Sequence, residues 1–156
     1  MSKFEERLGS DLELLDNRRF QDDRAGGSDL KARWRAATDA YDLAIVAGAE
    51  NISQALLLRF LTPQGELADL GHPTYGSRLH ELVGEPNTET NRNFAKLFAL
   101  QALAGEPRVE KVLSAQVRQR ASNRGAVDID LTLKIVRTDT PLNLVFPFSF
   151  DAGANA

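Results

Sequence analysis

The feature that most constrains the fold of this chain is a strict alternation of apolar and polar residues near its C-terminus. Its apolar members are Val127, Ile129, Leu131, Leu133 and Ile135. The residues between them are Asp128, Asp130, Thr132 and Lys134. Because successive side chains of a β-strand point to opposite faces, this stretch predicts a strand with one buried face and one hydrated face.

Two neighbouring stretches predict the other strands of the same sheet. Residues 109–120 predict a partner strand, which the turn sequence Ser-Asn-Arg-Gly at residues 122–125 joins to the first strand. A third alternating set consists of Leu142, Leu144, Phe146, Phe148 and Phe150. Pro147 stands on the opposite face of this set, and since proline provides no backbone donor, the third strand is predicted to lie at a sheet edge.

The middle of the chain predicts helices. Asn51 and Gln54 have the spacing of a capping box at the start of one helix, and a short helix follows that ends at Gly84. Thr88 is predicted to cap a longer helix over residues 89–104. The predicted apolar side of this helix comprises Phe94, Leu97, Phe98, Gln101 and Ala102. Helices followed by strands predict an α+β fold, with the helices packed on a small, mostly antiparallel sheet of three or more C-terminal strands.

The start of the chain is mostly charged and polar. Alternation at Leu12–Leu14 and at Leu30–Ala36 predicts two short amphipathic strands, and residues 22–28 between them predict a loop. The apolar run Asp42–Val46 predicts a buried strand.

Length and composition limit the classes to which this protein can belong. With 156 residues, 42% of them hydrophobic, we expect an N-terminal extension over residues 1–41 and one domain over residues 42–156. The net charge is −3 with both signs intermixed, so nucleic acid is not an expected partner. The absence of cysteine excludes disulfides and thiolate metal sites. We expect neither a membrane span nor a secretion signal, because no apolar run approaches about 18 residues.

The junction between the helices and the strands offers the best functional candidate. Gly105 is predicted to close the long helix in the left-handed conformation, and Pro107 to hold Glu106 in an extended conformation. Glu106 and Arg108 would then point to one side of the chain, as an anionic and a cationic group together. They form either a docking point for a partner or an ordinary surface pair, worth roughly 0–1 kcal/mol.

Four motifs in order give this junction a context. They are Glu-Asn-Ile at 50–52, Leu-Thr-Pro-Gln-Gly-Glu-Leu at 61–67, His-Pro-Thr-Tyr-Gly-Ser-Arg-Leu at 72–79, and Gly-Glu-Pro-Arg-Val at 105–109. The series resembles the phage baseplate wedge family known as "gene 25-like lysozyme". That family includes sheath-initiator subunits of contractile phage tails, extracellular contractile injection particles and type VI secretion baseplates. The resemblance covers the chain from about residue 42 to about residue 112.

The resemblance implies a structural baseplate component. It implies that Glu106, Pro107 and Arg108 bind the wedge scaffold. It also implies that sheath subunits connect by exchanging terminal strands, and that this protein supplies the first acceptor at an exposed sheet edge. The edge-strand residues that we assign to this contact are Leu142, Leu144, Val145, Phe146, Pro147 and Phe148. Because Pro147 withholds a donor, the opposite sheet edge near residues 109–120 stays open as the alternative acceptor.

The expected partners follow from the same resemblance. They are baseplate wedge proteins, the sheath protein, and tube or hub proteins, with multiple copies of this chain in a symmetric particle. Assembly is expected in the bacterial cytoplasm, and the protein then becomes part of a phage virion or contractile injection particle. No cofactor is expected.

Two alternatives stay open: a peptidoglycan hydrolase of the tail, and a generic α+β adaptor protein. Glu13, Asp22 and Ser28 approach the phage-lysozyme spacing Glu-x8-Asp-x5-Thr, but among 22 acidic residues about one such Glu–Asp pair is expected by chance. We therefore expect no catalytic residues and no enzyme activity. His72 and His80 lack the spacing of a metal site and are expected to pack in a helix or loop.

Overall fold

The computed structural model of the chain describes residues 8–15 and 32–152. The chain forms two compact units, residues 1–55 and 56–156, and the boundary between them falls inside helix α2 (Ala49–Leu61). Each unit is described by itself. None of the helices in the described ranges has the length and apolar character needed to cross a membrane.

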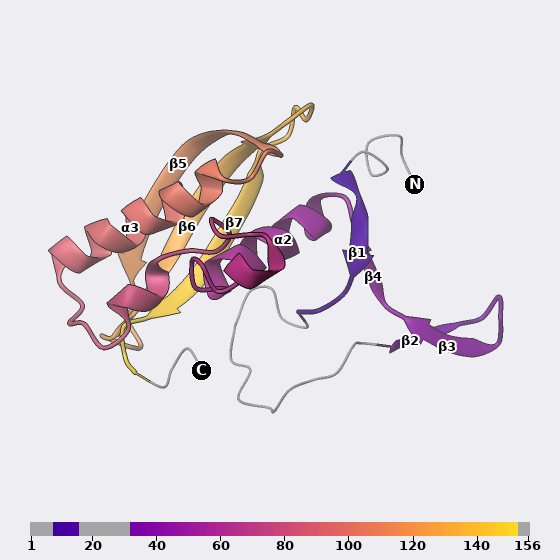
Figure 1. Cartoon of the computed structure of the whole chain (residues 1–156), viewed down its shortest axis with the longest axis horizontal. Coiled ribbons are helices and arrows are strands. Elements are labelled where there is room, and N and C mark those ends of the chain that lie inside the picture. The colour runs from indigo at the N-terminus through magenta and orange to yellow at the C-terminus, as the bar shows by residue number, and fades with distance from the viewer. Residues whose placement is uncertain (1–7, 16–31, 153–156) are drawn as a thin grey trace. The chain divides into compact units, whose positions relative to one another are not determined.

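The first unit contains two small antiparallel pairs of strands (Figure 1). β1 (Ser10–Leu12) pairs with β4 (Ile45–Ala47), and β2 (Ala32–Arg35) pairs with β3 (Ala40–Leu43). Every residue of the β2–β3 hairpin is exposed, so the prediction that this alternation buries one face is wrong. An isolated hairpin has nothing to bury a face against, whatever its sequence period. The loop predicted at residues 22–28 lies outside the described residues.

The buried strand predicted at residues 42–46 is also corrected. The run is divided between β3, which is exposed, and β4, which pairs with β1. Only Ala44 and Val46 of this run are buried. A short apolar run does not reveal that its two halves pair with different strands, because pairing partners are set by contacts distant in sequence.

Helix α2 begins at Ala49, three residues before the start that a cap at Asn51 would give. Asn51 therefore lies inside the helix, and its side-chain amide donates to the Leu8 carbonyl at 3.1 Å. Gln54 donates to the Leu12 carbonyl at 2.7 Å and accepts from the Leu14 backbone N–H at 2.9 Å. The capping-box prediction is wrong because these polar side chains satisfy backbone groups around β1 instead of the helix's own N-terminus.

The second unit contains the three-stranded sheet, and its strand order is β5–β6–β7 (Figure 1). β5 (Val109–Gln119), β6 (Ala126–Ile135) and β7 (Leu142–Ser149) run antiparallel to their neighbours. Two short 3-10 helices, η1 (Ala68–Leu70) and η2 (Leu79–Leu82), precede the long helix α3. The α+β fold with an antiparallel C-terminal sheet is confirmed, and so is the edge position of β7 in this sheet.

The two faces of the sheet differ as the alternation predicts. Val117, Ile129 and Phe146 are aligned across the three strands on the inner face, and Phe146 packs against Phe60 of α2 with 5.2 Å between ring centroids. The outer face carries ion pairs between neighbouring strands: Arg118–Asp130, Arg120–Asp128 and Lys134–Glu110. The sheet is therefore apolar toward the helices and charged on the other side.

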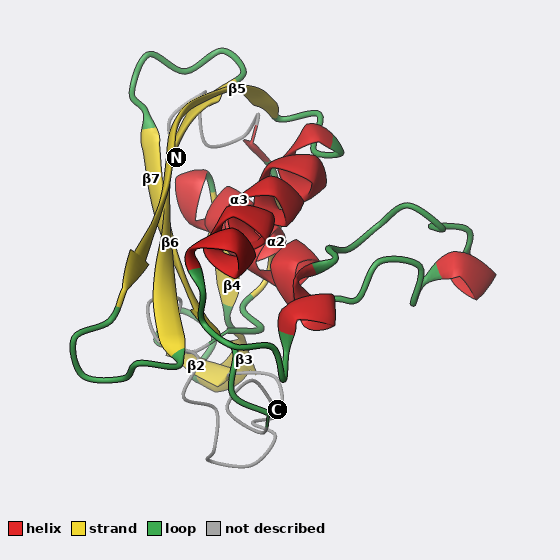
Figure 2. Ribbon diagram, turned by 90° about the vertical axis from the view of Figure 1, so that its left-hand side faces the viewer, coloured by secondary structure: helices red, strands yellow, loops and turns green. Residues whose placement is uncertain are grey.

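Helix α3 (Glu89–Ala104) contacts β5 and β6 on the inner face (Figure 2). Its predicted cap is confirmed, because the Thr88 hydroxyl accepts a hydrogen bond from the Asn91 backbone N–H at 3.2 Å. The predicted apolar side is displaced, since Phe94 and Leu97 are each 45% exposed. The buried residues are Ala95, Phe98, Ala99, Ala102 and Leu103. Three alanines among them let the helix lie close to the sheet, which larger side chains would prevent.

The segment after α2 folds back onto the end of that helix. The Ser77 backbone N–H donates to the Thr62 carbonyl at 2.8 Å, and the Ser77 hydroxyl donates to the Phe60 carbonyl at 2.8 Å. Gly76 permits this close approach, because its φ is 102° and a methyl group there would lie 2.5 Å from the Thr62 carbonyl oxygen. The third sequence motif is thus fixed to the second by backbone contacts.

We predict that Gly76→Ala destabilises the protein far more than Gly71→Ala. Both glycines have positive φ, 102° and 87°, but a methyl group at Gly71 would meet nothing within 4 Å. Gly71→Ala should lower the free energy of unfolding by about 1 kcal/mol, from backbone strain alone, and Gly76→Ala by about 3 kcal/mol or more. Urea denaturation of both variants measures the difference. Equal losses would mean that the close approach at Gly76 is unimportant.

Candidate partner-binding site

Gly105 ends helix α3 differently from the prediction. Its φ of −84° and ψ of 0° are not left-handed, and its N–H donates to the Ala102 carbonyl at 3.2 Å. Any residue can adopt this conformation, so the reason for glycine is space. A methyl group at Gly105 would lie 3.1 Å from Nη1 of Arg59, which packs against this point from α2.

The Glu-Pro-Arg motif forms a β-turn, and the prediction of an extended segment is wrong. The Val109 N–H donates to the Glu106 carbonyl at 3.0 Å, with Pro107 at the second position of the turn, where its fixed φ is favourable. Nε of Arg108 donates to Oε1 of Glu106 at 2.6 Å, and Nη2 donates to Oε2 at 3.2 Å. The two side chains meet as predicted, but they do so around a turn.

Glu106 is not an ordinary surface carboxylate. Its side chain is only 6% exposed, and a second arginine, Arg59, has its Nη2 at 3.6 Å from Oε2. The Arg59 side chain is 10% exposed, whereas that of Arg108 is 33% exposed. The cluster of Arg59, Glu106 and Arg108 therefore has a buried interior and presents Arg108 to solvent.

Arg59 is the member of this cluster that sequence reasoning missed. Its guanidinium lies over the ring of Tyr75, with Cζ at 4.4 Å from the ring centroid, a cation–π geometry. Its Nε is buried without a hydrogen-bond partner. The available signal was a charged residue adjacent to Phe60 on an otherwise apolar helix face. Arg59 connects helix α2 to two of the motifs, since it stacks on Tyr75 and contacts the turn at Glu106.

The two arginines keep Glu106 ionised. Burial alone would raise the pKa of Glu106, but the hydrogen bonds and charge of Arg108, together with the charge of Arg59, outweigh it and hold the pKa below its usual range. At neutral pH the cluster carries one negative and two positive charges, because arginine stays protonated. Its net charge is therefore positive.

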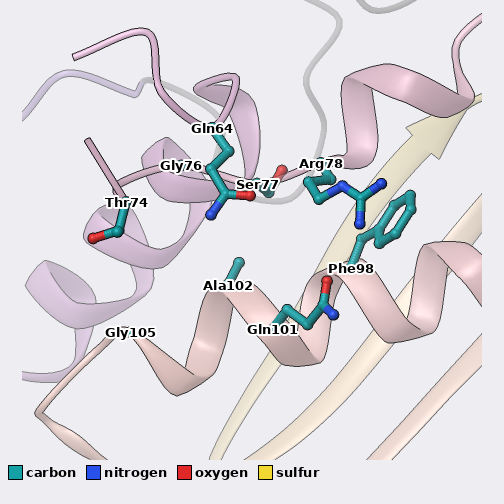
Figure 3. Close-up of a pocket in the computed structure, with 9 residues that line it drawn as sticks. All are labelled: Gln64, Thr74, Gly76, Ser77, Arg78, Phe98, Gln101, Ala102 and Gly105. Atoms are coloured by element: carbon teal, nitrogen blue, oxygen red, sulfur yellow. The ribbon is translucent and has the colours of Figure 1, made fainter. Parts of the chain in front are cut away.

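A shallow pocket of about 250 Å³ lies next to this cluster. Gln64, Gly76 and Arg78 line it opposite Phe98 and Gln101 of α3 (Figure 3). Arg78 stacks on Phe98 at 4.4 Å and pairs with Glu81 at 2.7 Å. Arg78, the charged side chain in the pocket, thus already has two partners. The residues that line the pocket include no acid–base or nucleophilic group in a catalytic arrangement.

The backbone of β7 can be assigned to its two sides. The Phe150 N–H donates to the Gly125 carbonyl at 2.8 Å, and pairs in an antiparallel ladder alternate between bonded and non-bonded. The register of the β6–β7 ladder therefore directs the backbone groups of Leu142, Leu144, Phe146 and Phe148 toward β6. The backbone groups of the alternate residues, Asn143, Val145, Pro147 and Ser149, face outward. Because Pro147 has no backbone N–H, the open edge of β7 lacks one donor there, whereas the β6–β7 ladder loses none.

The side chain of Val145 is 43% exposed, in contrast to the buried Leu144 and Phe146. The outward row of β7 offers amide donors at Asn143 and Val145, whereas Pro147 offers none. Within the described residues no strand pairs with this row, and none pairs with the outer side of β5. A guest strand could add to either edge.

The remaining candidate residues show no convergent chemistry. Glu13 is 5% exposed and pairs with Arg33 at 3.4 Å, while Asp22 and Ser28 lie outside the described residues. His72 is exposed, and Nδ1 of His80 lies 3.1 Å from the Ser77 carbonyl. Over residues 8–15 and 32–152, no three acidic, histidine or cysteine side chains are grouped to hold a metal ion.

Comparison with known proteins finds similarity to solved structures. No protein-family model matches the chain, and no curated protein matches it significantly. The fold is similar to the 1.44 Å crystal structure of a Geobacter sulfurreducens protein named "putative tail lysozyme", with 25% sequence identity and a TM-score of 0.59. The match covers 69% of this chain and 96% of that chain. This similarity agrees with the resemblance that the four motifs indicate.

We predict that Glu106→Gln destabilises the protein by about 3 kcal/mol at neutral pH, because it leaves the buried charge of Arg59 uncompensated. The folded-state pKa of Glu106 is depressed, so its stabilising charge is fully present above the unfolded pKa and is lost as pH falls through the folded pKa. The difference between wild type and variant should therefore shrink as the pH falls below the usual pKa of a glutamate, roughly 4.3. Denaturant titrations above and below that pH measure it.

The matched control is Glu81→Gln, which removes a carboxylate that also pairs with an arginine stacked on an aromatic ring. Glu81 is 42% exposed, so this variant should change the stability little. A loss as large as that of Glu106→Gln would show that burial of the cluster is not the cause.

Proposed function

We propose that this protein is a structural baseplate component of a contractile tail or contractile injection system. It docks on the wedge scaffold at residues 106–108 and initiates sheath polymerisation by strand exchange. The observation that carries the proposal is the outward row of β7, whose donors at Asn143 and Val145 can hydrogen-bond a guest strand. The order of the four sequence motifs and the tail name of the Geobacter protein support the tail context.

Residues 42–156 are proposed to form the baseplate domain and residues 1–41 an extension of it. The Geobacter structure supports a division of this kind, because the match covers 69% of this chain and 96% of the Geobacter chain. The proposed partners are wedge proteins, the sheath protein and tube or hub proteins. Assembly would take place in the bacterial cytoplasm before the protein becomes part of the particle.

The docking role predicts that Arg108→Ala leaves the domain folded but blocks assembly on the wedge. Truncating one side of a desolvated charge pair in an interface weakens binding by roughly 2–5 kcal/mol. Co-purification of the variant with wedge proteins measures the loss. The control is Arg118→Ala, which removes an exposed arginine paired with Asp130 on the outer face of the sheet. Wild-type recovery of Arg108→Ala would rule the docking role out.

The strand-exchange role predicts that Val145→Pro prevents sheath initiation. Since the Val145 N–H faces outward, proline there removes one donor from the open edge and none from the β6–β7 ladder. The control is Val145→Thr, which changes the exposed side chain and keeps the donor. Electron microscopy of particles assembled with each variant gives the sheath length. Full-length sheath on Val145→Pro baseplates would mean that the outer edge of β7 is not the acceptor.

The name of the Geobacter protein keeps a peptidoglycan hydrolase as the second candidate. Glycoside hydrolysis requires two positioned carboxyl groups. Glu106 is a buried carboxylate within the motifs, and two arginines bind it. Zymography of the purified protein on peptidoglycan separates the two functions. A cleared band from the wild-type protein would favour the hydrolase.

A further inference from the structure

We propose that the pocket between Gln64 and helix α3 binds a carboxamide, the side chain of an asparagine or glutamine on a partner protein, with Phe94 and Leu97 of α3 contacting an apolar residue next to it. The site uses neither the turn at residues 106–108 nor the edge of β7. It therefore stands independently of the proposed docking and strand exchange.

The pocket contains hydrogen-bonding groups that no described residue satisfies. Gln64 lines it from the loop after α2, and Gln101 lines it from α3 (Figure 3). Within residues 8–15 and 32–152 neither side-chain amide makes a hydrogen bond, although the Gln64 backbone N–H donates to the Ser77 carbonyl at 2.9 Å. Each amide offers two N–H donors and one carbonyl acceptor. A carboxamide carries the same complementary set, so it can pair with both glutamines.

The charge in the pocket is balanced, which makes the site selective for an uncharged group. Arg78 donates from Nε and Nη2 to the two carboxylate oxygens of Glu81, at 2.7 Å in each case. A carboxylate entering the pocket would compete with Glu81 for this fork, and a cation would meet the charge of Arg78. None of the described residues accepts a hydrogen bond from Nη1 of Arg78, so Nη1 can donate to a carboxamide oxygen.

The size of the pocket fits one side chain. Its volume is about 250 Å³. Pockets that enclose a whole small ligand are larger, roughly 300–1,000 Å³. The Arg78 guanidinium lies over the Phe98 ring at 4.4 Å, so this ring is not an open platform on which a sugar could stack. A protein side chain is therefore a better fit than a glycan.

Two exposed apolar residues extend the site along α3. Phe94 and Leu97 are each 45% exposed. Leu97 lies four residues before Gln101, which places the two on the same side of the helix, about 6 Å apart along its axis. The buried face of α3 is formed by other residues, three of them alanines. A partner segment that brings its carboxamide to Gln101 would therefore place a neighbouring apolar residue against Leu97 and Phe94.

Nitrogen-15 NMR titration of the full chain with capped dipeptides tests the site. The probes are acetyl-Leu-Gln-methylamide, acetyl-Leu-Glu-methylamide and acetyl-Leu-Ala-methylamide, which differ in one side chain. The glutamine probe should shift the side-chain amide signals of Gln64 and Gln101 and the Nε–Hε signal of Arg78. It should bind about tenfold more tightly than the other two. The side-chain amide of Gln116, which is exposed on β5, should stay unshifted.

Matched variants separate the two parts of the site. Gln64→Leu and Gln101→Leu keep most of the side-chain volume and remove the hydrogen-bonding groups, so each should weaken binding of the glutamine probe about tenfold. Gln116→Leu is the control and should leave the affinity unchanged. Leu97→Ser should weaken binding of acetyl-Leu-Gln-methylamide but not of acetyl-Gln-methylamide, because only the first probe carries the apolar neighbour.

Glu81→Gln tests the source of the selectivity. It leaves the Arg78 guanidinium without its carboxylate partner, so the preference should reverse in favour of the glutamate probe. Binding of that probe should weaken as salt is added. A variant that still prefers the glutamine probe would refute the role of the Arg78–Glu81 pair in the selectivity.

Other results overturn the proposal as a whole. Tighter binding of the glutamate probe to the wild-type chain would make the pocket an anion site. Saturable binding of N-acetylglucosamine with the same shifts would make it a glycan site and would favour the hydrolase. If the glutamine probe leaves the Gln64 and Gln101 amides unshifted up to its solubility limit, or binds Gln101→Leu as tightly as wild type, the pocket does not recognise a carboxamide.

Discussion

The carboxylate of Glu106 is the point on which the arrangement of the second unit's motifs depends. It receives Arg59 from the last turns of α2 and Arg108 from across its own turn. The Arg59 guanidinium also stacks on the ring of Tyr75, so the loop before η2 contacts the same cluster. A buried charge tolerates few alternative geometries, so this cluster restricts how helix, loop and turn can be placed relative to one another.

Two glycines of the motifs are explained by close contacts with groups distant in the sequence. Gly76 permits the close approach of the Thr62 and Pro63 backbone at the end of α2. Gly105 leaves space for the Arg59 guanidinium. Neither glycine is explained by a simple helix-stop rule.

The sheet adds a second constraint that fits an assembly role better than a catalytic one. Its inner face is closed by helix α3 and by Phe60 of α2, and its outer face carries ion pairs between strands. Among the described residues, no strand pairs with the outer edge of β5 or with that of β7. Pro147 limits the edge of β7 without weakening the ladder inside the sheet, which is how natural sheets restrict indiscriminate pairing.

The sequence by itself determined the α+β class, the three C-terminal strands, the buried faces of β6 and β7, the Thr88 cap and the meeting of Glu106 with Arg108. These features depend on local periodicity, on proline's missing donor and on residues two or three apart, which act whatever the rest of the chain does. Only the tertiary structure decided that α3 buries its alanine face, that Asn51 and Gln54 bind backbone near β1, and that Glu106 is buried against Arg59. Each of these depends on a group more than forty residues away or on the closeness of helix and sheet, and such contacts leave no period in the sequence.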